Sequence, residues 1–389
     1  MWQPVVMDSN ILYILTLSLV LVFSPYLSTY LKLPTAPIEI IIGSLLASVG
    51  IISAEMGEET IIFDLMAEVG FLYLMFLAGL EVNLRTLLKI EQTYLFRSLV
   101  FLMVLTLLTL MIGHFILHLN PIIVASLPLI SLGLLASLSK EYGKDQAWIK
   151  MALLVGVIGE VLSITSLTIL EVSVALGFSI DLFYKLLLLI GFLGIIVGIY
   201  YLLHLIFWWY PELKTIIMPQ TDLKDQDIRL AIGIFFIMIA IMKWLHLELA
   251  FGAFIAGLFI STFFYHKREL EHKMSSFGFG FLVPIFFIHV GASFDYIYLS
   301  AVLGTALKIM MVMILIRLLA SLTLIRIIGI RDAILVGLSL AMPLTLLIAT
   351  ATVGFHHDIL DEHSYYAIIL ASLLEVILIM IAIKFIVKR

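Results

Sequence analysis

The sequence predicts an all-α polytopic membrane protein of about thirteen transmembrane helices, arranged as two repeats of inverted topology. Three observations support this fold class: the apolar composition, the spacing of the apolar runs and an internal repeat. Of the 389 residues, 63% are hydrophobic and 13% are charged, whereas about 25% are charged in an average soluble domain. This composition excludes a soluble enzyme, a disordered chain and a secreted disulfide scaffold, and the chain has no cysteine. The near balance of 22 basic and 27 acidic residues gives no indication of nucleic-acid binding.

The apolar runs, separated by charged residues, prolines or glycines, define the elements in chain order. A helix needs about 20 apolar residues to cross a hydrocarbon core of about 30 Å. The first run follows no basic residue and lacks a small-residue cleavage site, so we expect a retained span and not a signal peptide. The expected helices are residues 9–30, 36–53, 61–80, 94–117, 121–139, 147–173, 182–207, 227–244, 248–264, 277–293, 297–325, 331–354 and 364–386.

Basic residues gather in alternate loops and so predict the orientation. One side carries clusters such as Lys140, Lys144 and Lys150, whereas the other side offers only Lys185 and Lys243. Because Lys and Arg are enriched in cytoplasmic loops, we expect a multi-pass protein of the cell (inner) membrane. Its N-terminus is expected outside and its C-terminus in the cytoplasm.

Matching residues recur in the two halves of the chain at a nearly fixed separation of 212 to 215 residues. Corresponding segments are seven apart, an odd number, so they cross the membrane in opposite directions. Inverted repeats of this kind are typical of secondary transporters that work by alternating access. An old duplication without present mechanistic meaning is the alternative. The pairs are Gly43 with Gly257, Gly79 with Gly291, Pro128 with Pro343, and Glu160 with Glu375.

Three ionisable residues are predicted near the middle of the membrane, where a charge is costly and indicates a functional site. Glu160 follows Lys150 by ten residues, which places it about 15 Å deep. Arg317 precedes Arg326 by nine residues, at a similar depth, and Glu375 lies well inside the last helix. We expect Glu160 to bind a cation or a proton, Arg317 to be its charge partner and Glu375 to be a candidate second carboxylate. The alternative is a structural Glu160–Arg317 salt bridge.

Two prolines at matched positions predict helix breaks near mid-membrane. Pro128 and Pro343 would free carbonyl groups and half-helix ends beside Glu160. Ser131 and Thr345 would add neutral oxygen ligands for a hard monovalent cation. A kinked helix with no such role is the alternative for either proline taken alone.

No motif indicates an enzyme, a cofactor or a resident metal. The sequence contains no phosphate-binding loop, no dinucleotide fingerprint and no H-E-x-x-H. The polar loop 354–364, with three histidines, is expected to be solvated, and a divalent metal site there is the alternative.

Four segments carry a resemblance to a known family. The chain resembles the monovalent cation:proton antiporter superfamily, which includes the Na⁺/H⁺ exchangers and the Kef-type transporters, over essentially its whole length. The segments are LKLPTAPIEIIIGSLLASVGII, EVGFLYLMFLAGLEVNLRTL, PIFFIHVGASFD and ILIRLLASLTLIRIIGIRD. The resemblance implies a homodimer in which two broken helices cross. It also implies a dimerisation (panel) domain of residues 1–91 and 227–296, an ion-binding core of 92–178 and 297–389, and a linker of 179–226.

Two departures from the family pattern refine the expected function. Gly159-Glu160 stands where the family usually has a polar residue followed by Asp, and Arg317 stands where it often has Lys. Because Arg does not lose its proton, we expect electroneutral exchange of Na⁺ or K⁺ for H⁺ by alternating access, with Glu160 as the shared site. The alternatives are a non-transporting membrane sensor or scaffold of the same fold, and an organic-anion carrier on the same scaffold.

Overall fold

The computed structural model describes most of the chain, and the statements below concern that part. It covers residues 9–31, 35–50, 61–81, 92–176, 180–210, 212, 225–245, 247, 249–264, 268–293 and 299–388. These residues form helices and connecting turns, with no strand among them. Nine of the described helices are long and apolar enough to cross a membrane, and three further apolar helices are shorter. The predicted all-α membrane fold is confirmed.

The first half of the chain forms the helices expected for it. The expected segment 121–139 is divided into two short helices, and the expected segment 94–117 ends in a π-helical stretch. The elements are α1 (Ser9–Leu31), α2 (Thr35–Ser48), α3 (Ile61–Glu81), α5 (Gln92–Thr109), η1 (Leu110–Ile116), α6 (Pro121–Ser126), α7 (Gly133–Tyr142), α8 (Ala147–Leu176) and α9 (Ile180–Trp209).

The second half repeats this order. The expected segment 277–293 begins earlier, at Arg268, and the expected segment 331–354 is divided. The backbone of α16 is kinked at Gly329, where φ is 81°. The elements are α11 (Gln226–Leu245), α12 (Leu249–Phe263), α13 (Arg268–Phe277), η2 (Gly278–Leu282), α14 (Val283–Ala292), α15 (Leu299–Ser321), η4 (Leu322–Leu324), α16 (Ile325–Ser339), α17 (Leu344–His356) and α18 (Glu362–Lys388).

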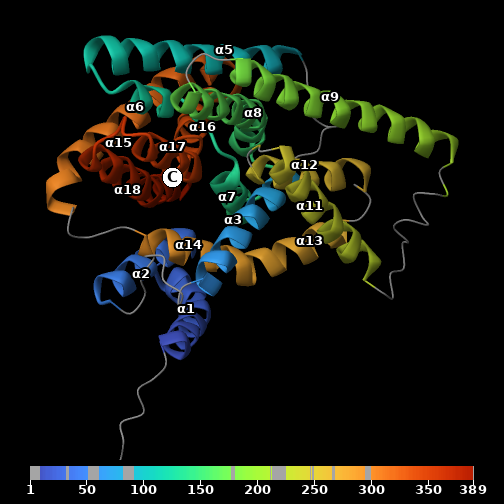
Figure 1. Cartoon of the computed structure of the whole chain (residues 1–389), viewed down its shortest axis with the longest axis horizontal. Helices are drawn as coiled ribbons and strands as arrows, with labels where there is room; N and C mark the ends of the chain where they lie inside the picture. The colour runs from blue at the N-terminus through green and yellow to red at the C-terminus, as the bar shows by residue number, and fades with distance from the viewer. Residues whose placement is uncertain are drawn as a thin grey trace, which may run out of the picture.

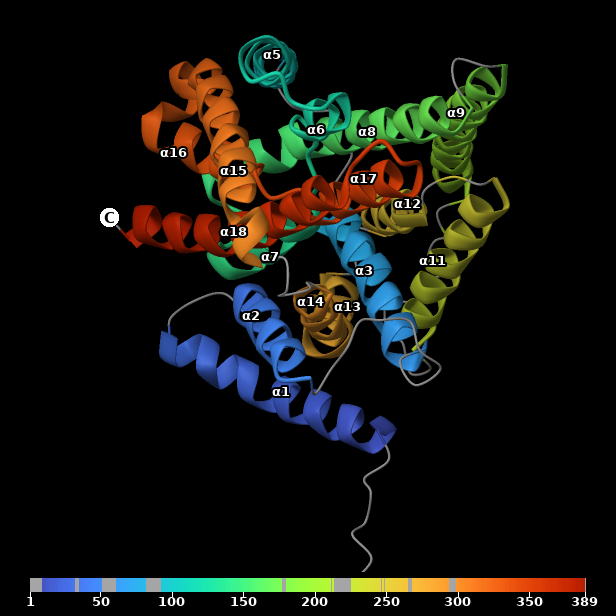
Figure 2. The same ribbon diagram turned by 60° about the vertical axis from the view of Figure 1, so that its left-hand side comes forward.

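The helices pack in two groups, each built from both halves of the chain (Figures 1 and 2). In the panel group, α12 packs on α3 and α11, and α14 packs on α2 and α3. In the core group, α18 packs on α15 and α17, α16 packs on α8, and α5 packs on α8 and α15. The names panel and core follow the two domains that the family resemblance implies, and the division into these domains stays a prediction. The exact domain boundaries and a movement between the domains stay predictions.

Two close helix crossings, at repeat-related positions, hold the panel group together. A Cβ atom on Gly43 of α2 would lie 2.1 Å from the carbonyl oxygen of Ile288 in α14, and one on Gly291 would lie 2.0 Å from that of Ile40. Gly79 of α3 and Gly257 of α12 meet in the same way. Since α2 corresponds to α12 and α3 to α14, the two crossings are copies of one contact. The inverted repeat is therefore visible in the packing as well as in the sequence.

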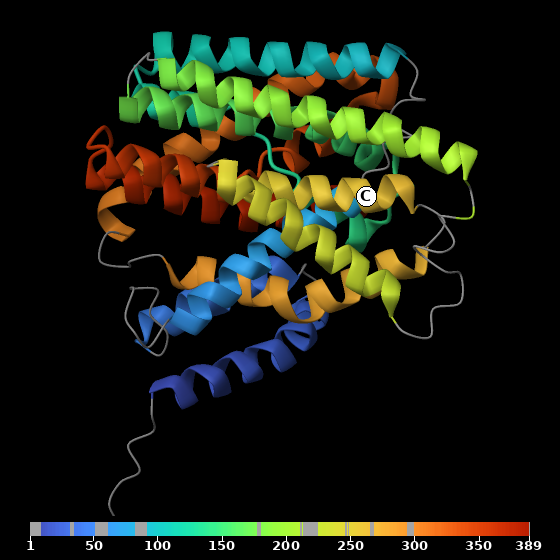
Figure 3. The ribbon, with the colours of Figure 1, turned by 45° about the vertical axis from the view of Figure 1, so that its right-hand side comes forward.

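The long helix α9 lies beside α8 and extends beyond the packed helices (Figure 3). Many of its apolar side chains are exposed, among them Phe183, Ile190 and Tyr201. An apolar surface of this extent is expected of a helix that faces lipid or another protein.

Candidate functional site

Both predicted prolines lie where a helix is interrupted. The chain is not helical over residues 127–132, between α6 and α7, or over 340–343, between α16 and α17. Pro128 lies in the turn that begins the first interruption, and Pro343 is the last residue before α17. Proline has no backbone N–H and fixes its own φ, so neither helix can continue through it without losing a hydrogen bond. Each interruption leaves carbonyl and N–H groups without helical partners inside the core group.

Arg317 connects the two interruptions. It lies on α15 with 0% of its surface exposed, and its Nε donates a hydrogen bond of 3.1 Å to the carbonyl of Leu340. Its Nη2 donates one of 2.6 Å to the carbonyl of Leu129, and its Nη1 donates one of 3.3 Å to Met313 within α15. The carbonyls of Leu340 and Leu129 lie beyond the C-terminal ends of α16 and α6, where partial negative charge gathers. The guanidinium therefore balances the partial negative charge at both helix ends and links the two interruptions.

Glu160 and Ser163, both on α8, hold the first interruption from the other side. Glu160 is 1% exposed, and its Oε2 accepts a hydrogen bond of 2.7 Å from the backbone N–H of Leu132. Leu132 is the residue before α7, so the carboxylate lies at the positive end of a half-helix. The hydroxyl of Ser163 accepts a hydrogen bond of 2.8 Å from the N–H of Ile130. Glu160 and Arg317 thus bind the same unwound segment three residues apart. The direct Glu160–Arg317 charge pairing stays a prediction.

Glu375 lies in the core group on α18 and is 0% exposed. Both of its carboxyl oxygens are buried and have no hydrogen-bond partner within the described residues. It interacts electrostatically with Arg317. Arg317 therefore contacts the first and the second interruption and interacts electrostatically with Glu375.

The remaining predicted ligands lie at the interruptions. Ser131 is buried and lines a small cavity together with Met342, and with Met75 and Phe287 of the panel group. Thr345 lies in the first turn of α17, but its side chain is outside the described part of the structure. Apolar side chains of α3 and α14 therefore close the region around Ser131.

Sequence reasoning missed two residues of this site. Ser163 was not singled out, although its spacing of three from Glu160 places both on one face of α8. Gly159 was noted only as a missing polar residue. A Cβ atom on Gly159 would lie 2.8 Å from the Cδ1 and 3.0 Å from the Cβ of Ile130. The absence of a side chain therefore lets the unwound segment lie directly against α8.

In the part of the chain that the structure describes, no group of three candidate metal ligands gathers at the polar loop before α18. His363 shares a hydrogen bond of 2.9 Å with the hydroxyl of Thr305 on α15. Hydrogen bonding to the side chain of Ser364 lowers the pKa of the exposed Asp361 carboxyl below its usual range. These contacts are typical of a solvated helix start.

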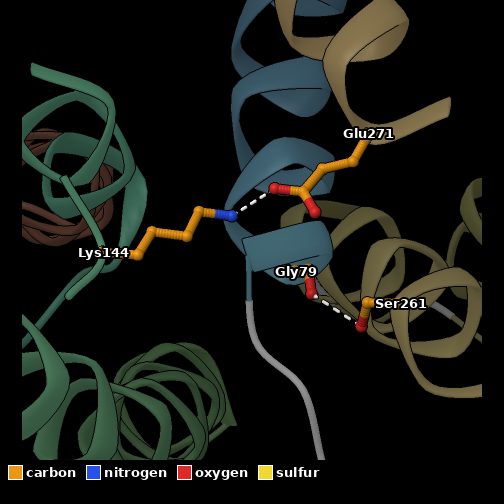
Figure 4. Close-up of polar contacts among 4 residues, drawn as sticks. All are labelled: Gly79, Lys144, Ser261 and Glu271. Atoms are coloured by element: carbon orange, nitrogen blue, oxygen red, sulfur yellow. Dashed lines mark hydrogen bonds and ion pairs between the residues drawn. The ribbon is translucent and has the colours of Figure 1, made fainter. Parts of the chain in front are cut away.

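Polar contacts between the two groups occur near the end of α7 (Figure 4). Lys144, just after α7, forms an ion pair with Glu271 of α13, beside the last turn of α3. The ammonium of Lys140 lies over the ring of Phe279, 4.2 Å from its centroid. In the panel group at the same place, the hydroxyl of Ser261 donates a hydrogen bond of 3.4 Å to the carbonyl of Gly79.

Comparison with known proteins agrees with this architecture. The chain is 32% identical over 162 residues to the Putative Na(+)/H(+) antiporter YjbQ of Bacillus subtilis (strain 168). That match covers 39% of this chain and 25% of the relative, so the chain matches about a quarter of the length of that relative.

Two solved structures of the sodium proton antiporter MjNhaP1 from Methanocaldococcus jannaschii share the fold. One, determined at pH 8, has a TM-score of 0.70 and 16% identity, and the match covers 96% of this chain and 98% of that one. The other, from an electron microscopy map, has a TM-score of 0.72 and 17% identity, with 95% and 94% covered.

A family model described as the transmembrane part of the sodium/hydrogen exchangers matches residues 17–389. The match includes both interrupted helices, α8 with Glu160 and α15 with Arg317. Members of this family are membrane transporters and not enzymes. The chain therefore belongs to the sodium/hydrogen exchanger family.

Proposed function

We propose that the chain exchanges a monovalent cation, Na⁺ or K⁺, for H⁺ across the cell membrane by alternating access. The observation that carries the proposal is the carboxylate of Glu160, buried in the core group and bound to the N-terminal end of α7. A carboxylate in such a place is neutralised either by a cation or by a proton, so the two compete. This competition is the minimum that an antiporter requires.

The surroundings of Glu160 support a site for a hard monovalent cation. Oxygen ligands suit such an ion, and the interruption beside Glu160 supplies the hydroxyl of Ser131 and backbone carbonyls. Thr345, at the start of α17, is the proposed ligand from the second interruption. Arg317 keeps its charge throughout, which favours one cation exchanged for one proton and no net charge moved.

A flux assay tests this proposal. Purified full-length protein is reconstituted in liposomes that contain a pH-sensitive dye, and Na⁺, K⁺ and Li⁺ are added in parallel. We expect cation-dependent proton flux in the wild type that is abolished in Glu160→Gln. The amide oxygen of Gln can still accept the hydrogen bond from Leu132, so the loss would report the charge and not the fold. Glu362→Gln, which alters an exposed carboxylate at the start of α18, is the matched control and should retain flux.

Three outcomes would contradict the proposal. Normal flux in Glu160→Gln would remove Glu160 from the mechanism. No flux with any of the three cations in folded wild-type protein would favour a non-transporting sensor or scaffold. Flux that depends on an added organic anion would instead favour an organic-anion carrier on the same scaffold.

We also propose a homodimer with its N-terminus outside and its C-terminus in the cytoplasm. The family resemblance and the distribution of Lys and Arg support this arrangement. Because the chain has no cysteine, a single cysteine in place of Lys144 or of Lys243 can be labelled without background. We expect an impermeant thiol reagent to label Lys243→Cys from outside intact cells and Lys144→Cys only after the membrane is opened. The reverse pattern would invert the topology. Crosslinking in the membrane and mass measurement in detergent test the dimer.

A further inference from the structure

Glu375 is a buried carboxyl group that the proposed exchange at Glu160 does not use. It is the repeat counterpart of Glu160, yet the two groups differ in what surrounds them. Glu160 accepts a hydrogen bond from Leu132 at the positive end of α7. Both oxygens of Glu375 lack hydrogen-bond partners among the described residues. An ionised carboxylate buried without hydrogen bonds is costly, and its neutral acid form is much less so.

The summed charge of Glu160, Glu375 and Arg317, called the buried cluster below, also indicates that Glu375 is the neutral acid. If Glu160, Glu375 and Arg317 were all ionised, the buried cluster would carry a net negative charge, which is unfavourable in the protein interior. One proton makes the cluster neutral. Since the environment of Glu160 favours its ionised form, the proton belongs on Glu375 in this structure.

Among the elements packed against α18, Arg317 is the charged group that acts on Glu375. Lys308 of α15 and Arg326 of α16 are exposed. Arg331 of α16 donates hydrogen bonds to the carbonyls of Ile386 and Val387, far along α18. The other charged or titratable side chains on these elements are Asp332 of α16, His356 of α17 and Glu39 of α2, and on α18 itself Glu362, His363, Tyr365, Tyr366, Lys384 and Lys388.

We propose that Glu375 carries the exchanged proton while Glu160 is free to bind the cation, and that Arg317 couples the two. When a cation binds the carboxylate of Glu160, the cluster gains one positive charge. The O–H bond of Glu375 then breaks, its proton leaves to solvent, and the carboxylate formed balances the cation. One cation enters for each proton released, and the net charge of the cluster stays the same. This inference rests on the proposed function. It keeps the exchange of one cation for one proton and the cation at Glu160, and it moves the proton from Glu160 to Glu375.

Proton release on cation binding tests the inference in purified full-length protein. NaCl or KCl is added to the protein in a weakly buffered solution with a pH indicator, and cation binding is followed in parallel by the rise of the unfolding temperature. We expect the wild type to release one proton for each cation bound. Glu375→Gln should still show the cation-induced rise in unfolding temperature but release almost no proton. Glu160→Gln should show neither response.

Glu39→Gln provides the matched control. Glu39 is also a buried carboxyl group of a transmembrane helix, but it lies on α2 and accepts a hydrogen bond of 3.2 Å from Ser24. Its replacement should leave proton release unchanged. Release of a full proton per cation by Glu375→Gln would overturn the inference and leave Glu160 as the proton carrier. No release by the wild type with any cation would instead count against the proposed function.

An infrared difference measurement on the wild type covers the case in which Glu375→Gln does not fold. Cation binding should remove the C=O stretch of a buried carboxylic acid, and Glu375→Asp should shift the frequency of that band. A cation-induced spectrum without such a band, or with a band that Glu375→Asp leaves in place, would also overturn the inference.

Discussion

At the scale of single residues, the position of Arg317 requires one side chain to donate hydrogen bonds to two separate interruptions. Its planar guanidinium reaches Leu340 and Leu129 at once, with two donors aimed in different directions. A lysine ammonium carries the same charge at a single point on a flexible chain and cannot reproduce this bridge. Hydrogen bonds from a charged group are worth about 1.5 to 3 kcal/mol each.

We therefore expect Arg317→Lys to lower the free energy of unfolding by about 2 to 4 kcal/mol, because at least one interruption loses its donor. Thermal unfolding in detergent measures the change. Arg326→Lys, an exposed substitution nearby on the next helix, should have almost no effect. Equal unfolding temperatures for Arg317→Lys and the wild type would show that the bridge adds nothing to stability.

Gly159 provides a second prediction at this scale. In a helix, Gly→Ala normally adds about 1 kcal/mol of stability, and Gly194→Ala on α9, with nothing within 4 Å of an added Cβ, should do so. Gly159→Ala should instead destabilise the protein, since the new methyl group would meet the Cβ of Ile130 at 3.0 Å. Ile130→Ala in the same chain should recover part of the loss. The unfolding temperatures of the wild type and the three variants test this, and a gain in Gly159→Ala would contradict it.

The sequence predicts the ionisable residues of the candidate site but not the groups to which the structure hydrogen-bonds them. Glu160, Arg317 and Glu375 were identified because charged residues inside apolar helices are rare, which requires no knowledge of the fold. The partners of Arg317 are backbone carbonyls, and every residue has one. No side chain at Leu129 or Leu340 marks them, so only the path of the chain reveals them.

At the scale of elements, glycines lie where α3 crosses α12 and where α2 crosses α14, and they leave no room there for a side chain. An added Cβ on Gly79 or Gly257 would lie 2.0 Å from a carbonyl oxygen of the partner helix. A backbone atom cannot turn away as a side chain does, so the helices themselves would have to separate.

We expect Gly79→Ala and Gly257→Ala each to cost at least about 2 kcal/mol of stability, near the upper part of the range for overpacked sites. Gly198→Ala, which meets nothing within 4 Å on α9, should be neutral or stabilising. Because the α2–α14 crossing is a copy of the same contact, Gly291→Ala should behave like Gly79→Ala. The yield of monodisperse protein and its unfolding temperature test all four. A mild effect at Gly79 and Gly257 would show that the crossing can relax.

The elements themselves followed from hydropathy, with one instructive error. The helix expected at 277–293 begins at Arg268 in the structure. The charged side chains of α13 lower its hydropathy, and by hydropathy alone they predict a polar loop. Its charged side chains form one face, on which Glu271 pairs with Lys144 and Lys273 lies 3.7 Å from Asp227. Leu270 on its other face is buried. A hydropathy average cannot separate these two faces, whereas the helical period does.

At the scale of the whole molecule, the panel and core groups contact each other through polar side chains near the end of α7 and through apolar side chains around Ser131. The ion pair of Lys144 and Glu271 spans the two groups, and Lys384 near the end of α18 donates a hydrogen bond of 3.0 Å to the carbonyl of Leu31 in α1. If the groups move against each other during transport, these contacts must break and form again in each cycle.

The ion pair between Lys144 and Glu271, called the latch below, therefore holds the panel and core groups together only weakly. Both side chains are 41% exposed, and a pair so exposed contributes at most about 1 kcal/mol. That energy changes an equilibrium between two arrangements about fivefold, so removing the latch should shift the balance between closed and open states without abolishing transport. Lys144→Glu would replace attraction by repulsion, and adding Glu271→Lys would restore the pair with its charges exchanged.

Accessibility of a single cysteine measures this balance directly, because the chain has none of its own. In a Ser131→Cys background, an impermeant thiol reagent is applied to the membrane face on which Lys144 lies. We expect Lys144→Glu to increase the labelling rate several-fold and the double exchange with Glu271→Lys to bring it back. Lys150→Glu reverses the charge of a lysine whose partner, Asp145, lies beside it in the same group. This substitution should leave the labelling rate unchanged. Equal labelling rates in Lys144→Glu and its parent would mean that the apolar contacts of α3 and α14, and not the ion pair, keep this end of the molecule closed.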